Sequence, residues 1–190
     1  FTKGIADNYR VTPADGELTM TNASAAITIT AASQGWTYDG SAHTNATVTV
    51  TQGSLLTGDT LVATATGSVT NVADTAEGNN PIAEGYKIMH GTEDVTANYA
   101  ITAVAGTLTI NPKAVTVTAQ DKAFTYTGSA QSWPEYDVDG LVGDDAIEAV
   151  VTGSITFPSE SPVVNELTSY EFTAGTPGNY TVEKINGQLT

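Results

Sequence analysis

Apolar and polar residues alternate along most of the chain. In the Val-Thr-Val-Thr segment at 115–118, the valines can face a core while the threonines face solvent, as is typical of a half-buried strand. β-Branched Thr, Val and Ile also favour the pleated backbone. The same period recurs in the segments 48–51, 61–66, 108–110 and 149–152. The pattern predicts a chain built from short β-strands.

Glycines separate these strand segments, and we find no convincing amphipathic helix between them. Residues 144–149 have the composition for one helical turn, but the corresponding residues 59–63 fit a strand better. The sequence therefore predicts an all-β protein.

Two phrases recur along the sequence. An Asn-Tyr pair followed by Gly-x-Leu-Thr occurs at 8–19, 98–109 and 179–190, and Tyr-x-Gly-Ser-Ala occurs at 38–42 and 126–130. The spacings are 98 − 8 = 90, 179 − 98 = 81 and 126 − 38 = 88 residues. Each Asn-Tyr phrase is expected to form a hairpin. The structural repeat residues are Tyr9, Tyr99, Tyr180, Tyr38, Tyr126, Gly40 and Gly128.

Repeats of this length are whole small domains in series rather than the short units of a solenoid. Residues 1–22 match the terminal hairpin of a truncated preceding repeat, 26–110 form the first full repeat, and 114–190 the second. We expect an elongated pair of antiparallel β-sandwiches, Ig-like in type. The alternative is a β-grasp type of curled sheet, which would need a helix. Pro112 in the joint suits a semi-rigid connection.

Composition narrows the range of partners. Lys and Arg number 6 against 21 Asp and Glu, giving a net charge of −15, which disfavours nucleic acid and anionic lipid. Cysteine is absent, which excludes thiol chemistry and disulfides. No segment approaches the ~18 apolar residues of a membrane span, so membrane insertion is not expected. The earlier copy continues past the point equivalent to Thr190, so we interpret the chain as a fragment of a longer protein.

The tripeptide at 38–40, the Gly-Asp pairs at 58–59 and 143–144 and the three Asn-Tyr phrases resemble the MBG and YDG repeat domains. These domains occur in tandem in large bacterial surface and secreted proteins, many of them adhesin-like. The resemblance implies an extracellular location, at the bacterial cell surface or secreted, and a role in adhesion or in spacing an adhesive domain from the cell. It brings no catalytic residues. Thr127 stands where the first repeat has Asp39, which argues against a required carboxylate there.

Aromatic residues supply the candidate binding sites. The Asn-Tyr tyrosines could stack on sugars, but their periodicity favours buried rings with hydroxyls bonded at the rim. Trp36 corresponds to Phe124, and both are expected in the cores. Trp133 has no aromatic counterpart and lies beside Pro134 and Tyr136. Trp133 and Tyr136 are therefore the candidate residues for stacking on a carbohydrate or binding a partner.

The acidic residues between 137 and 145 give the only candidate for a metal site. Asp137, Asp139, Asp144 and Asp145 offer oxygen ligands for Ca²⁺, but the spacing is not that of an EF-hand. The first repeat has a single acid in the equivalent stretch, so a solvated loop is the favoured interpretation. His43 and His90 lack partners at zinc-ligand spacing. No metal or cofactor is expected.

The chain has no strained nucleophile turn of the Gly-x-Ser-x-Gly type, and we expect that it is not an enzyme. Two hypotheses remain for its function. The first is a structural stalk or spacer that presents a distal domain and contacts neighbouring repeats of its own chain. The second is an adhesion module that binds host glycan, mucin or other surface proteins.

Overall fold

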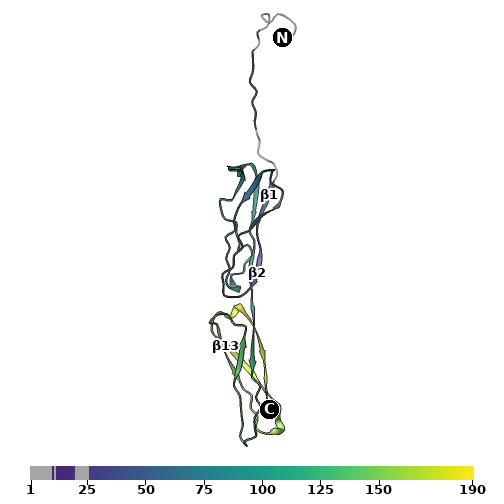
Figure 1. Ribbon diagram of the computed structural model, residues 1–190, viewed down its shortest axis with the longest axis vertical. Coiled ribbons are helices and arrows are strands. Elements are labelled where there is room, and N and C mark those ends of the chain that lie inside the picture. The colour runs from purple at the N-terminus through teal and green to yellow at the C-terminus, as the bar shows by residue number, and fades with distance from the viewer. Residues whose placement is uncertain (1–9, 11, 20–25) are drawn as a thin grey trace.

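The structure, a computed structural model, describes residues 10, 12–19 and 26–190. Two groups of strands lie end to end, and the chain passes once from one group to the other (Figure 1). β1 starts at the far end of the first group, and the C-terminus lies toward the far end of the second. Within the described residues the fold is all-β, with short 3₁₀ turns as the helical elements.

The first group holds strands of residues 26–111 and three small sheets, in the orders β3-β1-β7, β2-β8 and β4-β5-β6. Its elements are β1 (Ala26–Ala31), β2 (Gln34–Thr37), β3 (Val48–Gln52), β4 (Asp59–Val62), η2 (Val72–Asp74), β5 (Lys87–His90), β6 (Glu93–Asp94), η3 (Thr96–Asn98), β7 (Ala100–Val104) and β8 (Leu108–Asn111).

The second group repeats much of this arrangement, with sheet orders β10-β9-β14, β11-β13 and β12-β15. Its elements are β9 (Lys113–Ala119), β10 (Tyr136–Asp139), β11 (Ala146–Val151), η4 (Pro158–Glu160), β12 (Val163–Asn165), β13 (Leu167–Ala174), η5 (Pro177–Asn179), β14 (Tyr180–Ile185) and β15 (Gly187–Leu189).

The expectation of purely antiparallel sheets is wrong. β1 pairs with β7 in parallel, as β9 does with β14, and β2 with β8. The expected Asn-Tyr hairpin is also wrong for the second and third copies. In the second copy β7 and β8 pair with β1 and β2 rather than with each other, and in the third copy β14 and β15 pair with β9 and β12. The backbone kinks near Gly106 and continues in one direction. A Cβ at Gly106 would lie 2.2 Å from the Ala32 carbonyl oxygen, so this kink requires glycine.

The alternating segments bury the side chains that their period assigns to the core. In β1, Ile27, Ile29 and Ala31 are buried, while the intervening threonines are partly exposed. In β9, the equivalent Val115 and Val117 are buried in the same way. Each repeat therefore begins with a strand whose apolar face carries the core.

A buried asparagine joins non-adjacent segments in each repeat. Nδ2 of Asn80 donates to the carbonyls of Ala32 and Asn45, and its Oδ1 accepts from Gly67 N–H at 2.9 Å. Nδ2 of Asn165 likewise donates to two carbonyls of the second repeat. Buried amides that satisfy backbone groups in this way fix how loops lie on strands.

Part of the segment 1–22 lies outside the described residues, and this includes Tyr9. The described residues 12–19 carry no strand and are exposed, with Leu18 fully accessible at 101%. Leu18 therefore does not pack on the first repeat.

Candidate functional site: the junction between the repeats

The tyrosine of each Asn-Tyr phrase lies at the same place in its repeat. Tyr99 follows η3 and Tyr180 follows η5, and both rings are buried. The hydroxyl of Tyr99 donates to the Asp59 carboxylate and accepts from Leu56 N–H at 3.0 Å. Such a tyrosine fixes the loop before β4 on the strand that follows the 3₁₀ turn.

The second repeat reproduces this arrangement. The Tyr180 hydroxyl donates to the carboxylate of Asp145 and accepts from Val142 N–H at 3.2 Å. Burial and the hydrogen bond to the Asp145 carboxylate raise the pKa of Tyr180 above its ordinary range. The counterpart of Asp59 is therefore Asp145, not Asp144 as the paired glycines suggest, because Asp145 N–H bonds to the Val142 carbonyl as Asp59 N–H bonds to that of Leu56.

The first repeat adds a histidine to the tyrosine–aspartate pair. His90 Nδ1 lies 2.6 Å from Asp59 Oδ1, on the oxygen that Tyr99 does not use. The hydrogen bonds from Tyr99 and His90 lower the pKa of Asp59. This cluster lies at the end of the first repeat remote from the second, which we call its N-terminal face.

Asn179 is the polar centre of the junction between the repeats. It is buried at the end of η5, where its Oδ1 accepts from Val72 N–H at 2.9 Å and its Nδ2 donates to Asn71 Oδ1 at 2.8 Å. Both partners belong to the turn at η2 in the first repeat. Because all of the amide's polar atoms face this turn, the two bonds select one orientation of the second repeat.

The turn that receives Asn179 is itself held by a carboxylate. Asp74 Oδ2 accepts from the backbone N–H groups of Asn71 and Thr70, each at 2.8 Å. These bonds lower the pKa of Asp74. The conformation of the turn is therefore fixed by hydrogen bonds within the first repeat, independently of Asn179.

Apolar contacts surround this polar centre. The ring of Tyr38 meets the ring of Tyr180 edge to face at 5.3 Å, and Tyr38 is only 9% exposed. Gly40, at φ +78°, lies against Val142, and a Cβ there would come within 3.0 Å of its methyl group. One core cluster spans both repeats through Tyr38, Val69, Leu108, Ile110, Val115, Val117, Ala119, Ile147, Leu167 and Tyr180.

The Tyr-Asp-Gly turn at 38–40 forms one side of this junction. Asp39 Oδ1 accepts from Ser41 N–H at 2.8 Å and lies 3.0 Å from His43 Nε2, and these bonds lower its pKa. His43 in turn stacks on Trp36 at 4.8 Å. Trp36 is half-buried and packs against the shared core rather than within the first repeat alone.

The far end of the second repeat carries the same elements as the junction side of the first. We call this end its C-terminal face. Glu160 Oε2 accepts from the N–H groups of Thr156 and Phe157, as Asp74 does from its turn, and these bonds lower the pKa of Glu160. Gly128 has φ +80°, close to that of Gly40. Tyr126 occupies the place of Tyr38 but is 55% exposed.

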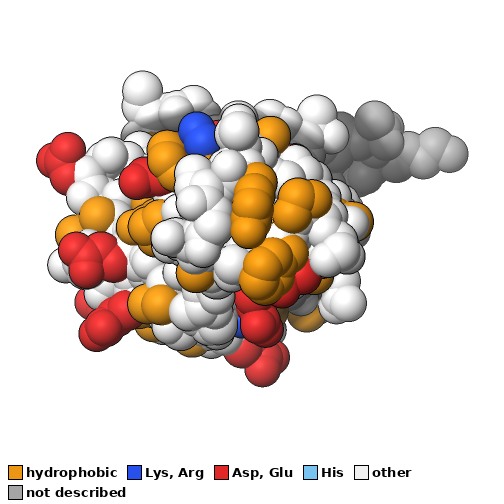
Figure 2. Space-filling view, turned by 90° about the horizontal axis from the view of Figure 1, so that it is seen from below, with side chains coloured by type: hydrophobic (Ala, Val, Ile, Leu, Met, Phe, Trp, Pro, Cys, Tyr) orange, Lys and Arg blue, Asp and Glu red, His pale blue; other side chains and the backbone are white. Residues whose placement is uncertain are grey.

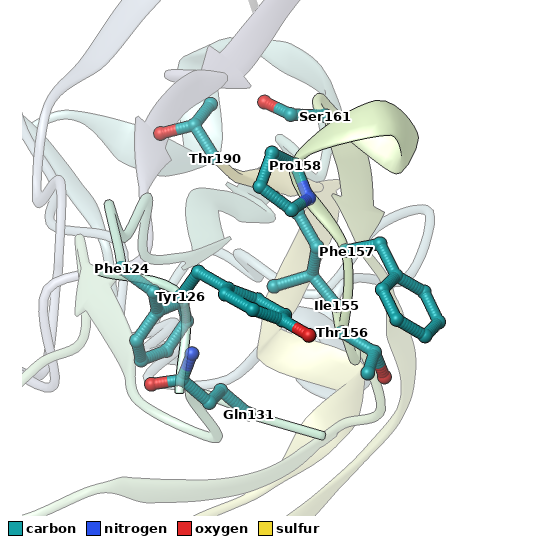
Figure 3. Close-up of a pocket in the computed structure, with 9 residues that line it drawn as sticks. All are labelled: Phe124, Tyr126, Gln131, Ile155, Thr156, Phe157, Pro158, Ser161 and Thr190. Carbon is teal, nitrogen blue, oxygen red and sulfur yellow. The ribbon is translucent and has the colours of Figure 1, made fainter. Parts of the chain in front are cut away.

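A cavity of about 180 Å³ opens on this face (Figure 3). Phe124 and Tyr126 lie on one side of it, and Pro158 and Phe157 lie on the other. Its lining residues are Phe124, Tyr126, Gln131, Ile155, Thr156, Phe157, Pro158, Ser161 and Thr190.

Neither of the two candidate sugar-binding residues lines the cavity on the C-terminal face. Trp133 is half-buried, its Nε1 donates to Gln120 Oε1 at 3.1 Å, and Lys122 Nζ lies 3.9 Å from its ring centre. One face of the indole is therefore covered by a cation. Tyr136 lies in β10 and packs partly buried against the core.

Two of the four acidic residues considered for calcium have hydrogen-bond partners. Asp137 accepts from Gln120 Nε2 through both oxygens at 3.1 Å, and Asp145 accepts from Tyr180. Asp139 lies with Asp137 in β10, whereas Asp144 precedes β11. Across the described part of the chain, no three carboxylate, histidine or cysteine side chains are grouped to hold a metal ion.

Sequence reasoning missed the amide contact at the junction. In the sequence, Asn179 stands out only as the neighbour of a repeated tyrosine, and Asn71 has no motif around it. The available signal was the recurrence of Asn before Tyr at residues 98 and 179, because an amide repeated beside a buried ring has a partner of its own.

Comparison with known proteins identifies the type of the second repeat. Residues 115–190 match the family model described as MBG domain (YGX type). No curated protein and no solved structure matches the chain. Within the described residues, no helix is long and apolar enough to cross a membrane. The second repeat is therefore similar to the MBG domain (YGX type), a domain type associated with surface proteins.

Proposed function

We propose that the two repeats form a stiff spacer in a bacterial surface protein, which holds a further domain at a distance from the cell. In this proposal each repeat is an Ig-like β-sandwich, the location is extracellular, and the role is structural rather than catalytic. The observation that carries it is the junction, where Asn179 and Tyr180 are buried against the end of the first repeat.

The reasoning from junction to spacer is geometric. A flexible joint would leave the facing ends of two domains solvated, with polar groups bonded to water. Here a core cluster continues across the boundary, and Asn179 bonds to the turn at η2 through both its polar atoms. Both features favour one relative orientation, so that the length of the two repeats adds along one axis (Figure 1).

The test measures the distance between the two ends of the molecule. The chain contains no cysteine, so Ser54→Cys and Ser129→Cys give unique sites for a pair of fluorophores. Ser54 adjoins Gly53 beside the start of β1, and Ser129 adjoins Gly128 on the C-terminal face. Single-molecule energy transfer should give one narrow distance distribution. A broad distribution in the unmodified junction would refute the spacer.

A matched pair of variants then tests the cause of the stiffness. Asn179→Leu keeps the side-chain volume roughly constant but leaves Asn71 and the Val72 N–H without their partner, and should broaden the distribution. Asn98 is the equivalent residue on the N-terminal face and is exposed. Asn98→Leu should leave the distribution unchanged.

The alternative function is an adhesion module for glycan or mucin, with Trp133 and Tyr136 as the contact. It is favoured only by the half-buried indole, and Lys122 would have to leave the ring before a sugar could stack on that face. A glycan array probed with the chain and with Trp133→Ala tests this role. Binding that is lost in the variant would favour adhesion over a purely structural spacer.

A further inference from the structure

The C-terminal face of the second repeat reproduces the surface on which the second repeat itself packs. Phe124 and Tyr126 occupy the places of Trp36 and Tyr38, and the bridge between Gln131 and Ile155 corresponds to that between His43 and Val69. The turn at η4 is held by Glu160 as the turn at η2 is held by Asp74.

What differs, within the part of the chain that the structure describes, is that this face is more exposed than the junction side of the first repeat. Tyr126 and Phe157 are 55% and 50% exposed, and their rings lie 6.3 Å apart. Apolar side chains gather at the end of the molecule, with acidic groups at the margin (Figure 2). An exposed apolar cluster on a rim of polar and charged groups is typical of a surface that binds another protein.

The chemistry of the face also differs at the point that receives Asn179 in the first repeat. Phe157 replaces Asn71, and Pro158 replaces Val72, relative to the turns fixed by Glu160 and Asp74. Phenylalanine has no polar atom to accept from an amide, and proline has no N–H to donate to it. An asparagine brought to this turn would therefore be buried with neither hydrogen bond.

We propose that this C-terminal face docks a further repeat of the same type, one that presents an apolar side chain where the second repeat presents Asn179. The proposal rests on the spacer function, and it specifies the chemistry of the repeat that would pack against the second one. The cavity of about 180 Å³ is of the size that accepts a benzene-sized group.

The same chemistry makes the face reject another copy of this chain. Both Asn-Tyr turns of the described repeats present asparagine, as Asn98 and Asn179. The two residues at the start of η2 or η4 therefore determine which residue the following repeat must carry before its repeated tyrosine. The pair Asn71–Val72 hydrogen-bonds to an asparagine side chain, whereas the pair Phe157–Pro158 accepts an apolar side chain.

The test is a three-repeat fusion, in which copies of residues 110–113 and 114–190 follow Thr190. One version keeps asparagine at the third repeat's equivalent of residue 179, and the other carries leucine there. Fluorophores on the second and third repeats report whether that junction is docked. We expect the leucine version to dock, and the asparagine version to have a docked-to-undocked ratio lower by roughly tenfold to a hundredfold.

A reciprocal change separates recognition from misfolding. Phe157→Asn with Pro158→Val, which copies the turn of the first repeat, should restore docking of the asparagine version and weaken that of the leucine version. Equal docking of both versions on the natural face would overturn the proposal. Failure of both versions to dock would also overturn it. The spacer function is tested separately by the distance between fluorophores at Ser54→Cys and Ser129→Cys, because that distance spans only the first junction.

Discussion

Removing the hydroxyl of Tyr180 should destabilise the second repeat without disturbing its packing. Tyr180→Phe keeps the ring that meets Tyr38 and Phe172, at 5.3 and 5.4 Å. It deletes the bond donated to Asp145 and leaves the Val142 N–H without an acceptor. A hydrogen bond to a charged group contributes about 1.5–3 kcal/mol, and an unpaired buried donor costs about 1–3 kcal/mol. Allowing for partial access of water, we expect a loss of about 2–4 kcal/mol in the free energy of unfolding.

The measurement is urea unfolding followed by circular dichroism. For a denaturant slope of about 2 kcal/mol/M, this loss lowers the midpoint by about 1–2 M. The control is Tyr126→Phe, the same chemical change at an exposed tyrosine on the C-terminal face, which should lower the midpoint by less than about 0.3 M. Equal effects of the two substitutions, or a Tyr180→Phe midpoint like that of the unmodified protein, would refute the role assigned to the hydroxyl.

Three further outcomes are expected. The hydroxyl and N–H of Thr96, with a nearby lysine, lower the pKa of Asp94 from 3.8 to about 2. As the pH drops from about 4 to 2, the unfolded chain takes up this proton before the folded chain does, so the free energy of unfolding falls. Asp94→Asn should flatten this part of a pH–stability curve. Asn80→Ala should lower the free energy of unfolding by about 2–4 kcal/mol in urea titrations, because two carbonyls and one N–H lose their partner. Gly106→Ala should lower the melting temperature by several degrees, since its Cβ would lie 2.2 Å from a carbonyl oxygen, whereas Gly16→Ala meets nothing within 4 Å and should not.

The alternation of residues located the strands but could not choose their neighbours. A period of two assigns Ile27 and Ile29 to the core, and Val115 and Val117 likewise, because successive side chains point to opposite faces. It says nothing of whether the partner strand runs parallel or antiparallel. The pairing of β1 with β7 depends on how the chain returns over the intervening loops, which have no periodic signal.

The polar contacts were harder to predict, for reasons that differ between residues. Asn80 and Asn165 stand in segments without alternation, where an asparagine is usually a turn residue. The sequence favours Asp144 over Asp145, because glycine precedes Asp144 as it precedes Asp59. The bond to Tyr180 shows which carboxylate is equivalent. The turn at Phe157 on the C-terminal face has a weak sequence signal, because it shares only its first threonine and a final acid with the turn at Asn71.

The parallel pairing of β1 with β7 and of β9 with β14 determines how the molecule bears a load. In each repeat the chain arrives at the start of the first strand and departs beyond the far end of its partner (Figure 1). Tension between the two termini therefore pulls these neighbours past one another along their length, so that the backbone bonds between them are strained together rather than one after another. Such a shearing arrangement resists force better than peeling does, which is the mechanical property that the proposed spacer would require.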